Sequence, residues 1–261
     1  MNKRPFNSRL FASQIPRHVA VMLVMPVALA WSSSAFCGLV HDAAQRGDLA
    51  KVKMLLKNNP RQISSKDNVG YTPLHWAALN GGKALAALLL AQGAEIDARS
   101  IVGATPLHWA ALKGHKDIVT LLLAHKAEIN AKDNEGKTPL QYAAQYDCKD
   151  VAALLLDKGA NVNAKDYEGN TPINDAAERG SQTVAVLLLT RGADASAKTN
   201  GSFTPLHWAT LSGQKEMAAL LIDHGADVNA KDKAGNTPLH IAVVNGFKVV
   251  ADLLRQHGGQ E

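Results

Sequence analysis

"TPLHWAA" at residues 72–78 is part of a stretch that the sequence repeats. The stretch recurs as TPLHWA at 105–110 and 204–209, and in variant form as TPLQYA at 138, TPINDA at 171 and TPLHIA at 237. The threonines that begin these stretches are 33 residues apart in every case. A fixed period indicates one copied structural unit, so the 261-residue chain is predicted to be an elongated array in which each unit contacts only its neighbours.

One period of the sequence predicts two short helices and a hairpin. Thr105 is suited to cap a helix, and Pro106 suits the first helical position because its missing N–H costs nothing there. Gly114 ends that helix, KDIVTLLLA (116–124) forms a second helix, and AEINAKD (127–133) is a turn-rich extended stretch. Such a unit cannot bury its own apolar face, so stacking on neighbours must provide the stability.

The two ends of the array differ from its middle. Residues 39–70 keep both helical patterns but lack the Thr-Pro start, and the last unit ends with the polar sequence LLRQHGGQE. Terminal units of an array need a polar outer face, so we interpret these segments as caps. The sequence therefore predicts about seven units, two of them caps and five internal copies.

GATPLHWAALKGHKDIVTLLLAHKAEINAKD (103–133), GNTPLHIAVVNGFKVVADLL (235–254) and GADVNAKD (225–232) resemble the ankyrin repeat, over roughly residues 39–258. The resemblance implies an all-α, curved α-solenoid whose projecting β-hairpin loops lie on the concave side. It also implies a protein-binding scaffold without catalysis of its own. We expect an ankyrin repeat domain over residues 36–261, with repeats at about 37–69, 70–102, 103–135, 136–168, 169–201, 202–234 and 235–261.

Residues 1–35 have the order of features typical of a secretory signal peptide. A basic start precedes the 13-residue apolar run VAVMLVMPVALAW, and small residues follow it. Cleavage is expected after Ala35 or Ala30, which would give a periplasmic or secreted bacterial protein. Without cleavage, the segment would anchor the chain to a membrane, although the run is shorter than the roughly 20 residues of a typical span. A mitochondrial presequence and lipidation at Cys37 are the remaining alternatives.

The distribution of charge argues against nucleic acid as a partner. The net charge of +5 includes four basic residues and no acidic residue within 1–35. Taking those four from the 28 basic residues leaves 24, against 23 acidic residues in the rest of the chain. A nearly neutral array attracts phosphates weakly. Cys37 and Cys148 lie about three stacked units apart, too far for a disulfide, so two free thiols are expected.

Three sets of residues could suggest chemistry, but each has a structural interpretation. His75, His108, His207 and His240 fall one per unit, on layers too far apart to share a metal ion, and are expected to tie each hairpin to its neighbour. The tryptophans that follow three of them, Trp76, Trp109 and Trp208, are expected in the core, and Asp175 interrupts their row. The recurrent Asp67, Asp133, Asp166 and Asp232 are expected to bond turns. We therefore expect no catalytic residues, metal or cofactor.

Three departures from the period fall at positions where other units have glycine. Lys126 and Asp147 are expected to carry backbone strain, because a helix end of this kind favours positive φ. We therefore expect local loosening in the middle of the array. Ser202 replaces the hairpin glycine, and Gly201 is expected to take over its role.

The residues that vary between copies are the candidates for binding a partner. On a curved array, the hairpin tips and the exposed ends of the first helices would form one concave strip, apolar first and then charged and aromatic. The alternative is scattered surface variation without a role. The expected strip consists of Val69, Tyr71, Leu79, Ile101, Val102, Leu112, Tyr146, Tyr167, Glu178, Arg179, Phe203 and Leu211.

The functional prediction is a monomeric, non-catalytic scaffold that binds another protein through this strip. Two alternatives are a membrane-anchored tether and an accessory or protective subunit of an envelope enzyme. Membrane contact is expected only if the N-terminal segment is not cleaved.

Overall fold

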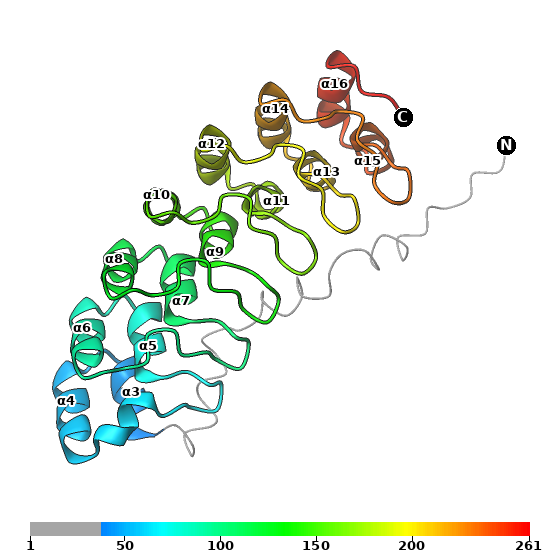
Figure 1. The fold of residues 1–261 in the computed structure, drawn as a ribbon. Coiled ribbons are helices and arrows are strands. Elements are labelled where there is room, and N and C mark those ends of the chain that lie inside the picture. Colours follow the sequence, from blue (N-terminus) through cyan, green and yellow to red (C-terminus); the bar gives the residue numbers. More distant parts are fainter. Residues whose placement is uncertain (1–37) are drawn as a thin grey trace. The chain divides into compact units, whose positions relative to one another are not determined.

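The structure is a computed structural model that describes residues 38–261 (Figure 1). The predicted signal peptide, both of its cleavage sites and Cys37 lie outside the described residues. Residues 38–261 form one compact unit, in which no helix is both long and apolar enough to cross a bilayer.

Seven helix pairs follow one another along residues 38–261 (Figure 1). The first helices of the pairs form an inner row: α3 (Leu39–Gln45), α5 (Pro73–Leu79), α7 (Pro106–Leu112), α9 (Pro139–Gln145), α11 (Pro172–Arg179), α13 (Pro205–Leu211) and α15 (Pro238–Val244). The second helices form an outer row: α4 (Leu49–Asn58), α6 (Lys83–Ala91), α8 (Lys116–Ala124), α10 (Lys149–Asp157), α12 (Gln182–Thr190), α14 (Lys215–Asp223) and α16 (Lys248–Gln256). A 3-10 helix, η2 (Pro60–Ser64), follows α4.

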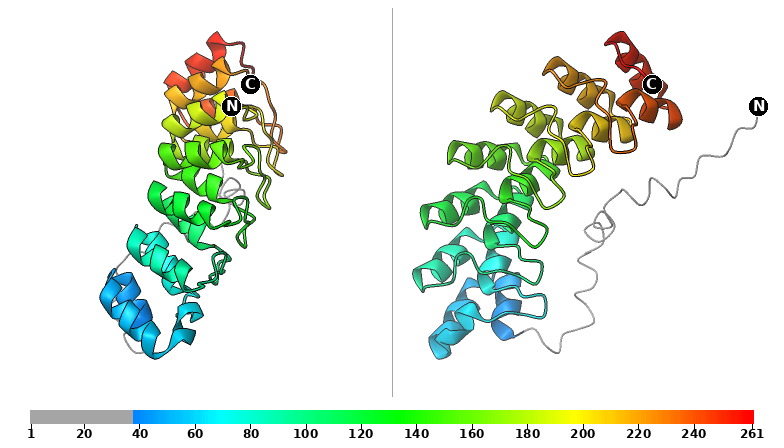
Figure 2. Two further views of the ribbon diagram at one scale, coloured as in Figure 1. Left: turned by 60° about the vertical axis from the view of Figure 1, so that its left-hand side comes forward. Right: turned by 45° about the vertical axis from the view of Figure 1, so that its right-hand side comes forward.

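Each inner helix packs against the next inner helix, and the core lies between the two rows. Leucines and alanines supply most of this core, as in Leu107, Ala110 and Ala111 of α7. Small side chains allow the helix layers to approach closely, which explains the regular stacking. The loops between units all project on the side of the inner row, toward the concave side of the array (Figure 2).

The Thr-Pro pair begins every inner helix from α5 to α15, as the sequence predicts. The proline takes the first helical position and the threonine precedes it as the cap. In α5, the backbone N–H of Thr72 donates to Nδ1 of His75, at 3.1 Å. Reciprocal bonds of this kind satisfy donors that the first helical turn leaves free.

Buried histidines join neighbouring units, which confirms the predicted role for His75, His108 and His207. His240, in the last described unit, makes no such side-chain bond within residues 38–261, so the prediction fails there. Nε2 of His75 donates to the carbonyl of Ala104 at 3.1 Å, and Nε2 of His108 donates to the carbonyl of Lys137 at 3.0 Å. His207 does the same with Asn236, while Gln141 and Asn174 replace histidine in the two middle units. Burial lowers the pKa of His75 to about 4, so its ring is neutral at pH 7. A neutral ring can accept at Nδ1 and donate at Nε2.

The hairpin loops contain no β-strand anywhere in residues 38–261, so the predicted β-hairpins are turns. An aspartate side chain replaces a strand ladder: Oδ1 of Asp133 accepts from the N–H groups of Glu135 and Lys137, each at 2.8 Å. Asp67, Asp166 and Asp232 bond in the same way, which confirms their predicted turn role. A single backbone bond links each tip to the next, from Asn134 N to the Val102 carbonyl, for example, at 3.0 Å.

The glycines of these turns are needed for backbone shape and for close approach. Gly136 has φ 81°, and a Cβ there would lie 2.8 Å from the backbone nitrogen of Tyr167. Lys126 and Asp147 adopt positive φ of 69° and 53°, as predicted. Ser202 itself has φ 62°, so the prediction that Gly201 would take over the role of the hairpin glycine is wrong. In this conformation the N–H of Ser202 donates to the Thr199 carbonyl at 2.9 Å, the same turn bond that Gly136 makes with Asp133.

Asp147 makes a compensating contact at its strained position. Its Oδ2 accepts from Oγ1 of Thr183 at 2.7 Å, and its Oδ1 accepts from the N–H of Val184 at 2.9 Å. Val184 lies in the first turn of α12, so a side chain from the preceding unit satisfies a free donor of that helix.

Candidate functional site

A column of aromatic rings, from the hairpin residue Tyr71 and the inner helices, crosses units two to four. The Tyr71 ring lies 5.2 Å from that of Trp76 and 5.3 Å from that of Trp109, and Trp109 lies 6.2 Å from Tyr142. Tyr142 is fully buried, whereas Trp76 and Trp109 are half-buried. Trp208, in unit six, is buried beside Phe203. The prediction of core tryptophans is therefore confirmed for Trp208 and holds only in part for Trp76 and Trp109.

The polar atoms of this column are satisfied by the turn aspartates in two units. Nε1 of Trp76 donates to Oδ2 of Asp67 at 2.9 Å, and the hydroxyl of Tyr142 donates to Oδ2 of Asp133 at 2.8 Å. Ser100 takes the place of these aspartates in the hairpin that precedes Trp109, and both Ser100 Oγ and Trp109 Nε1 are buried without a partner. The sequence indicates turn bonding by these aspartates but not this second contact.

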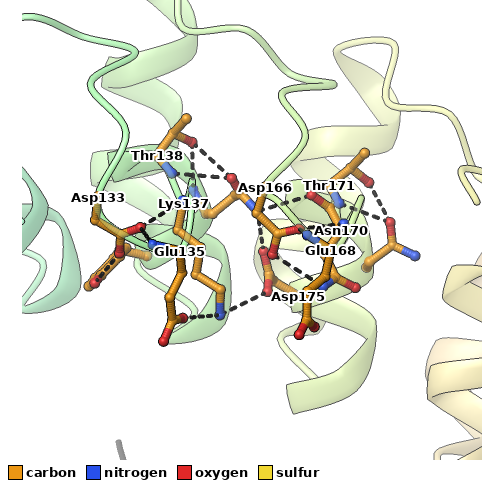
Figure 3. Close-up of polar contacts among 12 residues, drawn as sticks. Asp133, Glu135, Lys137, Thr138, Asp166, Glu168, Asn170, Thr171 and Asp175 are labelled. Carbon is orange, nitrogen blue, oxygen red and sulfur yellow. Dashed lines mark hydrogen bonds and ion pairs between the residues drawn. The ribbon is translucent and has the colours of Figure 1, made fainter. Parts of the chain in front are cut away.

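Asp175 interrupts the column with a buried carboxylate. Its Oδ2 accepts from Nε2 of Gln141 at 2.9 Å, and its Oδ1 lies 3.8 Å from Nζ of Lys137 (Figure 3). The same ammonium lies 3.9 Å from Oε2 of Glu135. Lys137 comes from the preceding hairpin and Gln141 from α9, so the contacts join two successive units. We call Glu135, Lys137, Gln141 and Asp175 the polar cluster.

Burial and charge shift the pKa values within this cluster. Burial raises the pKa of Asp175 to about 7, against the opposing effects of Lys137 and the Gln141 hydrogen bond. Burial lowers the pKa of Lys137, but the neighbouring carboxylates Asp175 and Glu135 outweigh it and leave that pKa raised. Burial also raises the pKa of the nearby carboxyls of Asp166 and Glu178. Lys137 is therefore charged at pH 7, while Asp175 is close to its titration midpoint.

The polar cluster is internally compensated rather than arranged for metal binding. Lys137 neutralises part of the carboxylate charge, and Asp166 accepts from Asn170 and from backbone N–H groups. Within residues 38–261, no group of three or more His, Cys, Asp and Glu side chains is placed to hold a metal ion. Cys148 is half-buried, and its thiol donates to the Leu112 carbonyl at 3.6 Å.

The predicted strip residues separate into three groups by exposure. Four large apolar side chains are exposed: Ile101 at 61%, Val102 at 41%, Tyr146 at 45% and Tyr167 at 64%. Val69, Tyr71, Leu79, Leu112, Glu178, Arg179 and Leu211 are half-buried. Phe203 is only 7% exposed, because it packs on the rings of His207 and Trp208, so the expectation that it lies on the surface is wrong.

The exposed members lie on hairpin tips and on the inner-helix end. Ile101 and Tyr167 are held by backbone bonds to the preceding tip, Ile101 N to the Val69 carbonyl at 3.2 Å and Tyr167 N to the Glu135 carbonyl at 2.9 Å. The Nζ of Lys132 lies 5.6 Å from the centre of the Tyr167 ring. Tyr146 follows the last residue of α9. The surface is therefore fixed by main-chain contacts rather than by flexible loops.

A row of cations along the hairpins is absent from the strip predicted from sequence. It consists of the exposed residues that directly precede the turn aspartates, or the residues that replace those aspartates in two hairpins: Lys66, Arg99, Lys132, Lys165, Lys198 and Lys231. We call these six the basic row. Their 33-residue spacing is readable in the sequence. The nearly neutral net charge of the array does not indicate this row, because a net charge carries no information on where the charges lie.

Comparison with known proteins agrees with this architecture. The family model for ankyrin repeats (3 copies) matches residues 38–100, 97–166, 132–199 and 173–261. Among curated proteins, ankyrin repeat domain-containing protein 13C-B of Xenopus laevis is 42% identical over 57 residues, or 22% of this chain and 11% of that protein. Palmitoyltransferase AKR1 of Naumovozyma castellii is 36% identical over 59 residues, 23% of this chain and 8% of that protein.

Human ankyrin repeat domain-containing protein 39 is 41% identical over 56 residues, 22% of this chain and 30% of that protein. The matched segments thus cover less than a third of each of these relatives, so their similarity concerns the repeats and not the whole proteins. The family model, by contrast, spans the described residues from the first helix pair to the last. Together with the period, the helix pairs and the bonds between units, this match shows that the chain belongs to the ankyrin-repeat family.

Proposed function

We propose that this array is a non-catalytic scaffold that binds a partner protein through its concave strip. Ankyrin repeats in general mediate protein–protein interaction. The observation that carries the proposal is the exposure of Ile101 and Val102 on unit two and of Tyr146 and Tyr167 on unit four. Exposed aromatic and aliphatic groups beside charged groups are typical of a protein-binding patch.

The rigidity of this surface supports recognition without chemistry. Ile101 and Tyr167 lie on tips that bond to the preceding tip, and the aspartate turns fix each loop internally. A partner would therefore meet a surface that is already ordered, and binding would cost little conformational entropy. Tyr71 and Leu112 are partly packed, so they contribute to the shape of the strip more than to its accessible area.

Affinity capture with matched variants tests the strip. The full chain serves as bait in parallel with Ile101→Ala/Tyr146→Ala/Tyr167→Ala and with Met54→Ala/Val186→Ala/Val249→Ala. The second triple removes exposed apolar groups from the outer helices α4, α12 and α16. We expect the strip variant to lose a protein that the parent and the outer-helix variant retain in equal amounts. Equal retention by all three baits would contradict the proposal, and loss from the outer-helix variant alone would assign binding to the convex side.

We also propose that the array acts outside the cytoplasm of a bacterium, after removal of residues 1–35 or 1–30. The order of basic, apolar and small residues at the N-terminus supports export. The intact mass of the protein isolated from its own cells tests this proposal. A mass that matches a chain starting at residue 31 or 36 supports cleavage. An uncleaved chain in the membrane fraction would favour the alternative of a membrane-anchored tether.

A further inference from the structure

The basic row is built into the stacking of the array. Nζ of Lys66 donates to the carbonyl of Arg99 at 2.8 Å, and Nη2 of Arg99 donates to the carbonyl of Lys132 at 2.7 Å. Lys132 and Lys165 reach the carbonyls of Lys165 and Lys198 in the same way, at 2.8 and 3.3 Å. Each of these side chains therefore spans the gap to the next member, and the cations lie in an ordered line.

These cations keep most of their hydrogen-bonding capacity. An ammonium has three donors and a guanidinium has five, so one bond to a carbonyl leaves several donors directed at solvent. Within residues 38–261, none of the six takes part in an ion pair with a carboxylate. The basic row thus presents a line of cations without an ion-paired carboxylate along the edge of the hairpins.

The polar cluster does not have this property. Lys137 and Gln141 already engage Asp175, and Lys137 also lies beside Glu135. A cationic partner group entering there would compete with Lys137, whereas an anionic group on the basic row would displace only water. Charge complementarity therefore favours an acidic partner segment on the basic row over a basic segment in the cluster.

The spacing of the row restricts the conformation of such a segment. Stacked helix layers lie roughly 8–10 Å apart. A polyproline II helix has three residues per turn and rises about 3.1 Å per residue, so every third side chain lies on one face at intervals of about 9 Å. A β-strand would place every third side chain on the opposite face.

We propose that the basic row binds an acidic segment of the partner protein, extended as a polyproline II helix with a carboxylate at every third residue. This inference rests on the proposed function, because it names the chemistry of the partner. The exposed Tyr167 ring beside Lys132 offers an apolar contact to the residues between the carboxylates. Nucleic acid, which also carries regular negative charge, is the alternative that the test must separate.

Fluorescence anisotropy with designed peptides tests the proposal on the full chain. The labelled probe is (Glu-Pro-Pro)6, which presents its six carboxylates on one face. One control, (Glu-Pro)6, has the same charge at the wrong spacing, and a second, (Lys-Pro-Pro)6, has the opposite charge. We expect the chain to bind (Glu-Pro-Pro)6 with an affinity that falls as the salt concentration rises. Its affinity for (Glu-Pro-Pro)6 should be at least about fivefold higher than for (Glu-Pro)6.

Variants assign the binding to the row. Lys132→Gln/Lys165→Gln should weaken (Glu-Pro-Pro)6 binding about fivefold, while Lys132→Arg/Lys165→Arg should retain it. Lys149→Gln/Lys215→Gln, at the exposed first turns of α10 and α14, makes the same change in net charge away from the row and should leave binding unchanged. An unchanged midpoint of thermal unfolding shows that the glutamine variants remain folded.

Three results would overturn the proposal: no binding of (Glu-Pro-Pro)6 to the parent, equal affinity for (Glu-Pro)6, or equal weakening by the off-row variant. Tighter, row-dependent binding of a thymidine oligonucleotide would reassign the row to nucleic acid. None of these results depends on the capture experiment. If the strip variant loses a partner but the parent chain does not bind (Glu-Pro-Pro)6, the proposed function stands and this inference is removed.

Discussion

Lys137 lies against Asp175 in the register in which Tyr71 lies against Trp109. In both pairs the second residue follows the first by 38 positions, and a hairpin side chain contacts the inner helix of the next unit. The aromatic contact of units two and three thus becomes an ion pair in units four and five. The same backbone geometry supports either chemistry, because the period fixes where the two side chains meet.

Asp175 should make the folded array less stable as pH rises from about 4 to 7. Its pKa is about 7 in the folded chain and about 3.9 in an unfolded chain, so the folded state binds more protons in this window. The pKa difference corresponds to at most about 4 kcal/mol of unfolding free energy. Relative to the parent, Asp175→Asn should gain stability progressively across the window in urea titrations. Parallel pH profiles for the two proteins would refute this assignment.

His75 should act in the opposite direction. Its folded pKa of about 4 lies below the usual 6.5, so the unfolded state binds more protons and stability is lost as pH falls from 6.5 toward 4. His75→Gln should flatten this loss by up to about 3 kcal/mol, because glutamine can make the same two contacts, as Gln141 does. His125→Gln, at the exposed end of α8, is the control and should keep the parent's acid profile.

Ser100→Asp should stabilise the array by about 1 kcal/mol. The new carboxylate would supply the missing acceptor for Nε1 of Trp109, and it would bond the N–H groups of Val102 and Ala104 as Asp67 and Asp133 bond theirs. Denaturant unfolding of the parent, Ser100→Asp and Ser100→Asn measures the effect. Ser100→Asn should raise the unfolding free energy by less than Ser100→Asp, because asparagine lacks the charge. A Ser100→Asp variant that is less stable than the parent would mean that the cost of burying the carboxylate outweighs its new hydrogen bonds.

Lys126→Gly should stabilise the array by about 0.5–1 kcal/mol, because Lys126 adopts a φ of 69° that glycine reaches without strain. The reciprocal change, Gly159→Lys, places lysine at the equivalent position, where φ is 92° and no atom lies within 4 Å of the new Cβ. It should destabilise by a similar amount. Unfolding free energies of the two variants should therefore move in opposite directions, and movement in the same direction would count against backbone strain as the cause.

The sequence predicted the features that depend on local pattern. Thr105 and Pro106 mark a helix start because capping is a local interaction. His75 could be expected to tie its hairpin to the neighbouring one because its copies share one register, and the structure supplies the acceptor, the carbonyl of Ala104. The recurrent period then fixed the order of the helix pairs without any knowledge of long-range contacts.

Contacts that vary between units were not predictable in this way. Phe203 is buried because Trp208 and His207 offer it two rings, whereas Tyr167, in the preceding hairpin, faces solvent beside Lys132. The pairing of Lys137 with Asp175 requires knowing which side chain of one unit reaches the next. Ser202, rather than Gly201, takes the left-handed conformation because the turn keeps its register even where the residue is unfavourable.

The acceptors of the bonds between units have an evolutionary consequence. His75 donates forward to the carbonyl of Ala104, and Cys148 donates backward to the carbonyl of Leu112. Backbone carbonyls are the same in every copy, so removing one whole period, residues 103–135, would offer His75 the carbonyl of Lys137 and Cys148 that of Leu79. A deletion that is not a whole number of periods would misplace both. Gene-level gain and loss can therefore lengthen or shorten this protein by one unit at a time without redesigning the joints.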